Sequence, residues 1–295
     1  MLAVDAALGE KPYLEKSVCC LHMGGFHDMV YSDWVPKKQM GRTILCVHGL
    51  TRSGRDFDRV AAALCAEGFR VIAPDIVGRG RSGTLGPHAT YETPQYISDI
   101  AALLAAEHLR EVDWIGTSMG GLIGMGLAGL QGQPIRRMMI NDVGPFIPKA
   151  ALERIGEYVG RDWRFDSFDD AVNHVRLAYE PFGLTRDEDW RYLAALSLRQ
   201  DVDGTWTNTY DRRIADAFKG DIADVDLWAL WDMLTVPILL LRGAESDLLP
   251  SDTATAMTER GPRAHLVEVP GCGHAPTLMV PDQIETVVKW AASGV

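Results

Sequence analysis

The feature that most constrains the fold is a regular alternation of apolar strand-like segments and amphipathic helix-like segments. Near-continuous apolar runs occur at residues 43–47, 70–74 and 112–116, and segments of helical periodicity separate them around 57–67 and 94–108. Such apolar runs are typical of strands that are covered on both faces. Strands that alternate with helices build right-handed units of a mostly parallel sheet. We therefore predict an α/β protein with helices on both faces of one sheet.

The same alternation extends over most of the chain of 295 residues, a length that suits one large α/β domain. Two strand-like segments at the start, separated by Gly24 and Gly25, read as a hairpin. With these strands the sheet should hold about eight strands. The further expected elements are a helix at 119–130, a strand at 136–142, a strand at 236–243, a helix at 251–260, a strand at 264–270 and a closing helix from Pro281.

One long segment interrupts this pattern. From residue 145 to 234 the chain is rich in Trp, Tyr, Asp and Arg, and its periodicity is helical. We expect a helical cap inserted after the sixth strand, so that residues 1–144 and 235–295 form the core domain. A cap in this position would cover the carboxyl edge of the sheet, where open α/β sheets bind ligands. Its five tryptophans suit the packing of the cap itself, and one or two of them could line a pocket.

A serine between glycines marks a candidate nucleophile. Residues 116–120, Gly-Thr-Ser-Met-Gly, match the pattern G-x-S-x-G between an expected strand and an expected helix. In that context the serine, Ser118, occupies a strained turn that exposes its hydroxyl, and the glycines let strand and helix approach closely. The pattern by itself is weak, because a glycine-rich packing turn would look the same.

Three further groups follow other expected strands. His48-Gly49 precedes Leu50, whose backbone N–H could form an oxyanion hole together with that of Met119. Asp247 follows the strand at 236–243, and His274 follows the strand at 264–270. Serine, aspartate and histidine in this chain order predict a nucleophile, an acid and a base.

Asp142 is an alternative acid, since it also follows an expected strand. We favour Asp247 because it follows the strand next to the one that delivers His274. Asp142 begins the exit into the expected cap, where Asn141-Asp142 with the Gly-Pro pair that follows also makes a good turn.

These motifs together resemble the α/β-hydrolase fold superfamily, from about residue 13 to the end of the chain. The segments "HGL", "GTSMGG", "GAESD" and "GCGHAP" carry the resemblance, and "PDIVGRGRSG" is similar to the family segment D-x-x-G-x-G-x-S. The segments "INDVGP" and "DGTWTNTYD" resemble capped bacterial hydrolases of esterase type. The resemblance implies Ser118, Asp247 and His274 as the triad, with no metal and no organic cofactor.

The predicted activity is hydrolysis of a carboxylic ester or lactone through an acyl-enzyme. A carbon–carbon bond hydrolase of a ring-cleavage diketone could use the same triad. However, the loop after His48-Gly49 reads "LTRSGRDF" and lacks the Gly-Pro-Gly form common among such enzymes. A non-catalytic fold that binds a ligand is the third reading, and an intact triad argues against it.

Several neighbouring residues have plainer readings. His48 is expected to hold its loop by hydrogen bonds, and Arg79 and Arg81 to pin a loop to the core. Arg52 reads as a solvated surface arginine, although it could meet an anionic substrate group. Cys272, close to His274 in the sequence, is expected to be an unreactive buried thiol.

Charge and composition exclude some classes of partner. The net charge of −11 argues against nucleic acid and anionic membrane surfaces, which attract basic faces. No apolar run approaches the roughly 20 residues of a membrane span, and the first 16 residues lack the features of a secretion signal. Five cysteines without metal or redox spacing suit a reducing compartment. We therefore predict a cytoplasmic protein that acts on a small ester or lactone; its oligomeric state is not readable.

Overall fold

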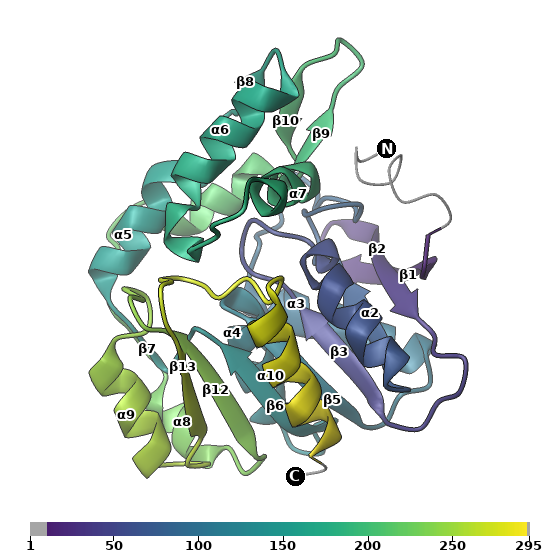
Figure 1. Cartoon of the computed structure of the whole chain (residues 1–295), viewed down its shortest axis with the longest axis vertical. Coiled ribbons are helices and arrows are strands. Elements are labelled where there is room, and N and C mark those ends of the chain that lie inside the picture. The colour runs from purple at the N-terminus through teal and green to yellow at the C-terminus, as the bar shows by residue number, and fades with distance from the viewer. Residues whose placement is uncertain (1–10, 294–295) are drawn as a thin grey trace.

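The computed structural model describes residues 11–293, and its centre is an eight-stranded sheet (Figure 1). The strand order is β1-β2-β4-β3-β5-β6-β12-β13, with β1 and β2 antiparallel to their neighbours and all later pairs parallel. The strands are β1 (Leu14–His22), β2 (Gly25–Trp34), β3 (Thr43–Val47), β4 (Arg70–Pro74), β5 (Val112–Thr117), β6 (Ile135–Asn141), β12 (Ile238–Gly243) and β13 (His265–Val269). The predicted fold class is confirmed, and so is the hairpin, in which His22 pairs with Gly25.

Helices cover both faces of the sheet. In Figure 1, α2 (Asp58–Ala66) and α10 (Pro281–Ala292) lie in front of it, and α3 (Thr93–Ala106) and α4 (Met119–Ala128) lie behind. Each of these elements begins within a few residues of the position that the periodicity predicts. Further helices of the core are η1 (Gly54–Phe57) and α9 (Ser251–Glu259), and α8 (Trp228–Met233) belongs to the segment between β6 and β12 but packs against α4.

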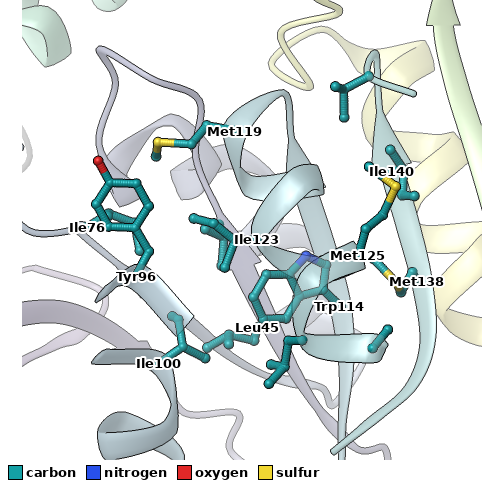
Figure 2. Close-up of a cluster of buried hydrophobic side chains, with 14 of the residues drawn as sticks. Leu45, Ile76, Tyr96, Ile100, Trp114, Met119, Ile123, Met125, Met138 and Ile140 are labelled. Atoms are coloured by element: carbon teal, nitrogen blue, oxygen red, sulfur yellow. The ribbon is translucent and has the colours of Figure 1, made fainter. Parts of the chain in front are cut away.

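Successive residues of the central strands enter two different hydrophobic cores. In β3, Leu45 and Val47 face the core under α3 and α4, while Ile44 and Cys46 face the core under α2 and α10. This alternation explains the continuous apolar run, because a strand between two helical layers buries both of its faces. Figure 2 shows part of the first core, in which Trp114 of β5 lies beside Leu45. The Trp114 indole N–H donates to the Gly120 carbonyl at 3.1 Å and so ties β5 to the start of α4.

Most of the segment between β6 and β12 lies over one end of the sheet, as Figure 1 shows, whereas α8 near its end lies beside the core. Its helices are α5 (Lys149–Tyr158), α6 (Phe168–Ala178), η2 (Glu180–Phe182), α7 (Asp187–Ser197) and η3 (Arg212–Phe218). It also contains short strands, which the helical periodicity did not predict: β8 (Arg164–Phe165), β9 (Leu198–Gln200) and β10 (Trp206–Asn208) form one small sheet, and β7 (Phe146–Ile147) pairs with β11 (Val225–Asp226). Strands of two or three residues are too short to produce a recognisable alternation. We call residues 145–234 the inserted segment.

Within residues 11–293, no helix is long and apolar enough to cross a membrane. Most of the N-terminal stretch in which we found no secretion signal lies outside the described residues.

Candidate active site

Ser118 lies at the junction of β5 and α4, in the strained backbone conformation that its motif predicts. Its φ is 50° and its ψ is −115°, a conformation that is costly for a non-glycine residue. The flanking glycines are required by close packing. A Cβ on Gly116 would lie 2.4 Å from the Gly120 carbonyl oxygen, and one on Gly120 would lie 2.0 Å from the Val47 carbonyl oxygen. A larger residue at either position would push the helix away from the sheet.

A continuous hydrogen-bonded chain joins this serine to a histidine and a carboxylate. His274 Nε2 lies 3.0 Å from Ser118 Oγ, and His274 Nδ1 lies 2.8 Å from Asp142 Oδ2. The three groups are therefore arranged as a nucleophile, a base and an acid. The structure brings the predicted Ser118 and His274 together, but the carboxylate is the alternative one.

Asp142 is held from several sides. Its side chain is fully buried, and its backbone has a φ of 58°, which aspartate tolerates better than most residues. The Gly243 N–H donates to Oδ1 at 2.8 Å, and the Ser246 hydroxyl donates to Oδ2 at 2.7 Å. Thr117 of β5 pairs with Asn141 of β6, so Ser118 and Asp142 leave neighbouring strands side by side.

The structure contradicts the expectation that Asp247, the predicted acid, lies beside His274. Its side chain is 49% exposed and makes two contacts with Arg154 of α5, from Arg154 Nε to Oδ2 at 2.5 Å and from Nη2 to Oδ1 at 2.9 Å. The reason lies in the distance from the strand ends. Asp142 directly follows the last residue of β6, whereas Asp247 comes four residues after the end of β12 and faces the inserted segment. The residue of that loop that does reach the site is Ser246.

Two backbone N–H groups beside Ser118 are available to donate to a substrate oxygen. Within the described residues, neither the Leu50 nor the Met119 N–H donates a hydrogen bond. Met119 begins α4, whose N-terminus adds partial positive charge. Leu50 follows Gly49, where a Cβ would lie 3.7 Å from the Ser118 Cβ. The pair has the properties of the predicted oxyanion hole.

Two buried side chains, His48 and Arg79, hold the Leu50 loop. His48 lies within hydrogen-bonding distance of the Gly49 carbonyl at 2.7 Å through Nδ1, and its Nε2 accepts from the Ile76 N–H at 2.9 Å. Burial lowers the pKa of His48 to about 4, so it is neutral at pH 7. Arg79 Nε donates to the Leu50 carbonyl at 2.8 Å. Arg81 has the expected anchoring role through Asp75, 2.7 Å away.

The loop that carries His274 packs against the inserted segment. Gly273 N–H donates to the Pro181 carbonyl at 2.6 Å, and a Cβ on Gly183 would lie 2.1 Å from the Gly271 carbonyl oxygen. On the core side, the Asn141 amide donates to the Pro276 carbonyl at 2.8 Å. The imidazole is thus positioned by contacts from both the core and the inserted segment.

Cys272, in the same loop, is buried and does not contact the triad as a hydrogen-bond partner; its Sγ donates weakly to the Val269 carbonyl at 3.6 Å. Burial raises the pKa of its thiol to about 11, and Asp142 and Glu245 contribute to the same shift.

Two pockets of different character adjoin Ser118. The apolar pocket has a volume of about 440 Å³ and is lined mainly by aliphatic and aromatic side chains, among them Leu122, Val143, Leu152 and Phe218. The polar pocket is smaller, about 60 Å³. Its lining includes Thr51, Arg52, Arg154, Tyr158, Tyr179 and His274. No tryptophan lines either pocket within the described part of the chain.

A group of residues that could hold a metal ion lies elsewhere. The ligand atoms of Cys20, His27 and Asp99 lie within 4.8 Å of one another, on β1, β2 and α3, and all three residues are buried. His27 Nε2 already bonds to Asp99 Oδ2 at 2.9 Å. In the strand order, three strands separate β2 from β6 and four separate β1 from β6, so this group is not part of the site at Ser118.

Comparison with known proteins identifies the family. The model of the alpha/beta hydrolase family matches residues 44–288. The chain belongs to the alpha/beta hydrolase family. That match spans β3 to α10 and so includes Ser118, Asp142 and His274.

Relatives of this alpha/beta hydrolase support the assignment. It is 44% identical to a 3-hydroxybutyrate-oligomer hydrolase of Cupriavidus necator over 90% of this chain and 94% of the relative. Among solved structures, a putative hydrolase from Rickettsia typhi has 30% identity and a TM-score of 0.88, with 96% of this chain and 100% of that one covered. An alpha/beta hydrolase from Novosphingobium aromaticivorans has 33% identity and a TM-score of 0.85, covering 95% and 99%.

Sequence reasoning missed two residues of this site. Arg52 does not face solvent but is buried at the polar pocket, where it contacts Asp56 and Ser197. The spacing Arg52–Asp56 would have suggested an ion pair, although not its burial. Ser246 gave no separate signal, because a serine next to a candidate acid reads as part of a turn.

Proposed function

We propose that this alpha/beta hydrolase cleaves carboxylic esters through an acyl-enzyme on Ser118. The observation that carries the proposal is the chain from Ser118 Oγ to His274 to buried Asp142. His274 Nε2 takes the hydroxyl proton as Ser118 Oγ attacks the ester carbonyl, and Asp142 orients and stabilises the imidazolium. The N–H groups of Leu50 and Met119 donate to the oxyanion of the tetrahedral intermediate.

The second half of the reaction uses the same groups. When the intermediate collapses, the bond to the alcohol oxygen breaks and the imidazolium gives its proton to that oxygen. Water then attacks the acyl-enzyme while His274 takes a proton from it, and the acid leaves as Ser118 is restored. No step needs a metal or an organic cofactor.

As the substrate class we propose short oligoesters of 3-hydroxybutyrate or closely similar hydroxy acids. The 3-hydroxybutyrate-oligomer hydrolase of Cupriavidus necator supports this class, because its 44% identity to this chain extends over nearly the whole of both chains. A pocket on either side of Ser118 also suits a substrate with a residue on each side of the ester bond. Domain boundaries at residues 144 and 235 are part of this proposal, with the inserted segment as the cap that closes over the oligomer.

The test combines product analysis with labelling of the nucleophile. Purified enzyme should release 3-hydroxybutyrate from its linear dimer and trimer, measured by chromatography. A fluorophosphonate should label one residue, and a peptide map should place it on Ser118. Ser118→Ala should lower kcat by about 10³-fold or more for every ester. Labelling of another residue in active enzyme would overturn the assignment.

A further inference from the structure

We propose that Arg154 of α5 binds the free carboxylate of the substrate, so that the enzyme selects esters whose alcohol part is a hydroxy acid with a free carboxyl end. This inference rests on the proposed esterase function and adds a binding site to it. Arg154 lines the polar pocket together with Ser118 and His274, so a cation faces the space beside the reacting ester.

The hydrogen bonds of Arg154 leave one end of its guanidinium available. Asp247 binds the edge formed by Nε and Nη2. Within residues 11–293, Nη1 has no hydrogen-bond partner. Because a guanidinium presents five N–H groups in a planar fork, Nη1 and the second hydrogen of Nη2 can still hold a carboxylate.

The other arginine of this pocket does not offer the same capacity. Arg52 Nε and Nη2 bind Asp56 at 2.8 and 2.6 Å, and its Nη1 donates to the Ser197 hydroxyl. All three nitrogens are therefore engaged, and the Arg52 guanidinium also lies over the Tyr179 ring. Arg52 thus links η1 to α7 through these hydrogen bonds. Arg154, in contrast, lies at the pocket rim with 38% of its side chain exposed.

The chemistry of the substrate agrees with the difference between the pockets. In a linear dimer of 3-hydroxybutyrate, the acyl part ends in a hydroxyl and the alcohol part carries the free carboxylate. One hydroxy-acid unit with its charge suits the smaller polar pocket, and a longer acyl part suits the larger apolar pocket. An anionic group in the apolar pocket would lose its hydration without a partner.

Asp247 acquires a role in this arrangement as a positioning residue. Its two hydrogen bonds hold the guanidinium in one orientation, so that Nη1 is presented without further loss of side-chain entropy. The carboxylate that the sequence suggests as the catalytic acid thus acts through Arg154 and not through His274.

The experiment compares two esters that differ in one charge: the linear 3-hydroxybutyrate dimer and its methyl ester. Arg154→Gln should raise KM for the dimer about tenfold and leave kcat within about twofold, the effect of removing one partly exposed charged hydrogen bond. For the methyl ester, kcat/KM should change less than about twofold. Arg154→Lys should lower KM for the dimer part of the way from the Arg154→Gln value to the wild-type value. Asp247→Asn should raise KM for the dimer about threefold.

A matched control comes from the inserted segment itself. Arg191 of α7 pairs with exposed Asp169 and lies outside both pockets. Arg191→Gln should therefore leave KM and kcat unchanged for both esters. If Arg154→Gln affects both esters equally, or neither, carboxylate binding by Arg154 is wrong while the esterase stands. If wild-type enzyme hydrolyses neither ester, the proposed function itself fails.

Discussion

The two pockets beside Ser118 share part of their lining but differ in volume and in the polarity of their other residues. Leu50, Ser118 and Ile155 line both, so both are open to the same hydroxyl. On one side, α5 contributes Leu152 to an apolar surface; on the other, the same helix contributes Arg154 and Tyr158. A single amphipathic helix of the inserted segment therefore borders an apolar pocket on one side of Ser118 and a more polar pocket on the other.

This difference separates the contributions of the core and of the inserted segment to the proposed site. The core supplies the proposed reacting groups Ser118, Asp142 and His274, which meet at the carboxyl ends of β5, β6 and β13. The inserted segment supplies most of the contrast between the pockets. Changes in the core should therefore affect every ester alike, and changes on α5 should affect one half of the substrate.

The largest effect that does not distinguish the pockets is expected from Asp142→Asn. The amide would favour the wrong imidazole tautomer, so kcat should fall about 10³- to 10⁴-fold for charged and neutral esters alike. Asparagine tolerates the positive φ of this position, so the fold should be retained, as circular dichroism and thermal unfolding would check.

The comparison variant is Asp247→Asn, for which the loss should be no more than about threefold and confined to KM of the anionic ester. Should the losses in kcat be reversed, with Asp247→Asn inactive and Asp142→Asn active, Asp142 could not be the acid.

A smaller effect, confined to one pocket, is expected from Leu152→Trp. The indole would occupy space in the apolar pocket and exclude long acyl chains, so kcat/KM for p-nitrophenyl hexanoate should fall about tenfold. p-Nitrophenyl acetate should lose less than about twofold. Leu177→Trp, at an exposed leucine of α6 outside both pockets, serves as the control. Equal losses for both chain lengths would mean that the acyl part lies elsewhere.

The smallest effect is expected from Cys272→Ser, at a thiol that lines neither pocket. We expect less than a twofold change in kcat/KM for either ester. Since the pKa of Cys272 is about 11, only about one thiol in a thousand is ionised at pH 8, and alkylation by iodoacetamide should be slow and speed up as pH rises further. Mass spectrometry of the alkylated peptide checks the rate. Rapid labelling at pH 7, or loss of activity as deep as in Ser118→Ala, would contradict this assignment.

Local signals predict most of the fold and two of the three side chains in the hydrogen-bonded chain at Ser118. The apolar runs of β3, β4 and β5 reveal buried strands because each buries both faces, and the glycines around Ser118 reveal a close strand–helix junction. His274 is found from its place after the last expected strand. These features depend on a few neighbouring residues, and so they are visible in the sequence.

The choice between the two aspartates depends on distances that local patterns do not contain. Both follow strands that lie between β5 and β13, so the order of the sheet does not separate them. What separates them is the backbone after each strand: Asp142 turns at once into the site, while the loop after β12 bends so that Ser246 faces inward and Asp247 faces Arg154. The short strands of the inserted segment were missed because each spans only two or three residues, and because two of their pairings, β8 with β10 and β7 with β11, join segments that are remote in sequence.

The hydrogen bond from Gly273 to the Pro181 carbonyl has a consequence for how such enzymes diversify. Because the loop that carries His274 packs against the inserted segment, exchanging that segment as a whole between relatives would also disturb the position of the His274 imidazole. Point substitutions on α5 leave this contact intact. New substrate preferences should therefore accumulate by single changes along one helix more readily than by module exchange.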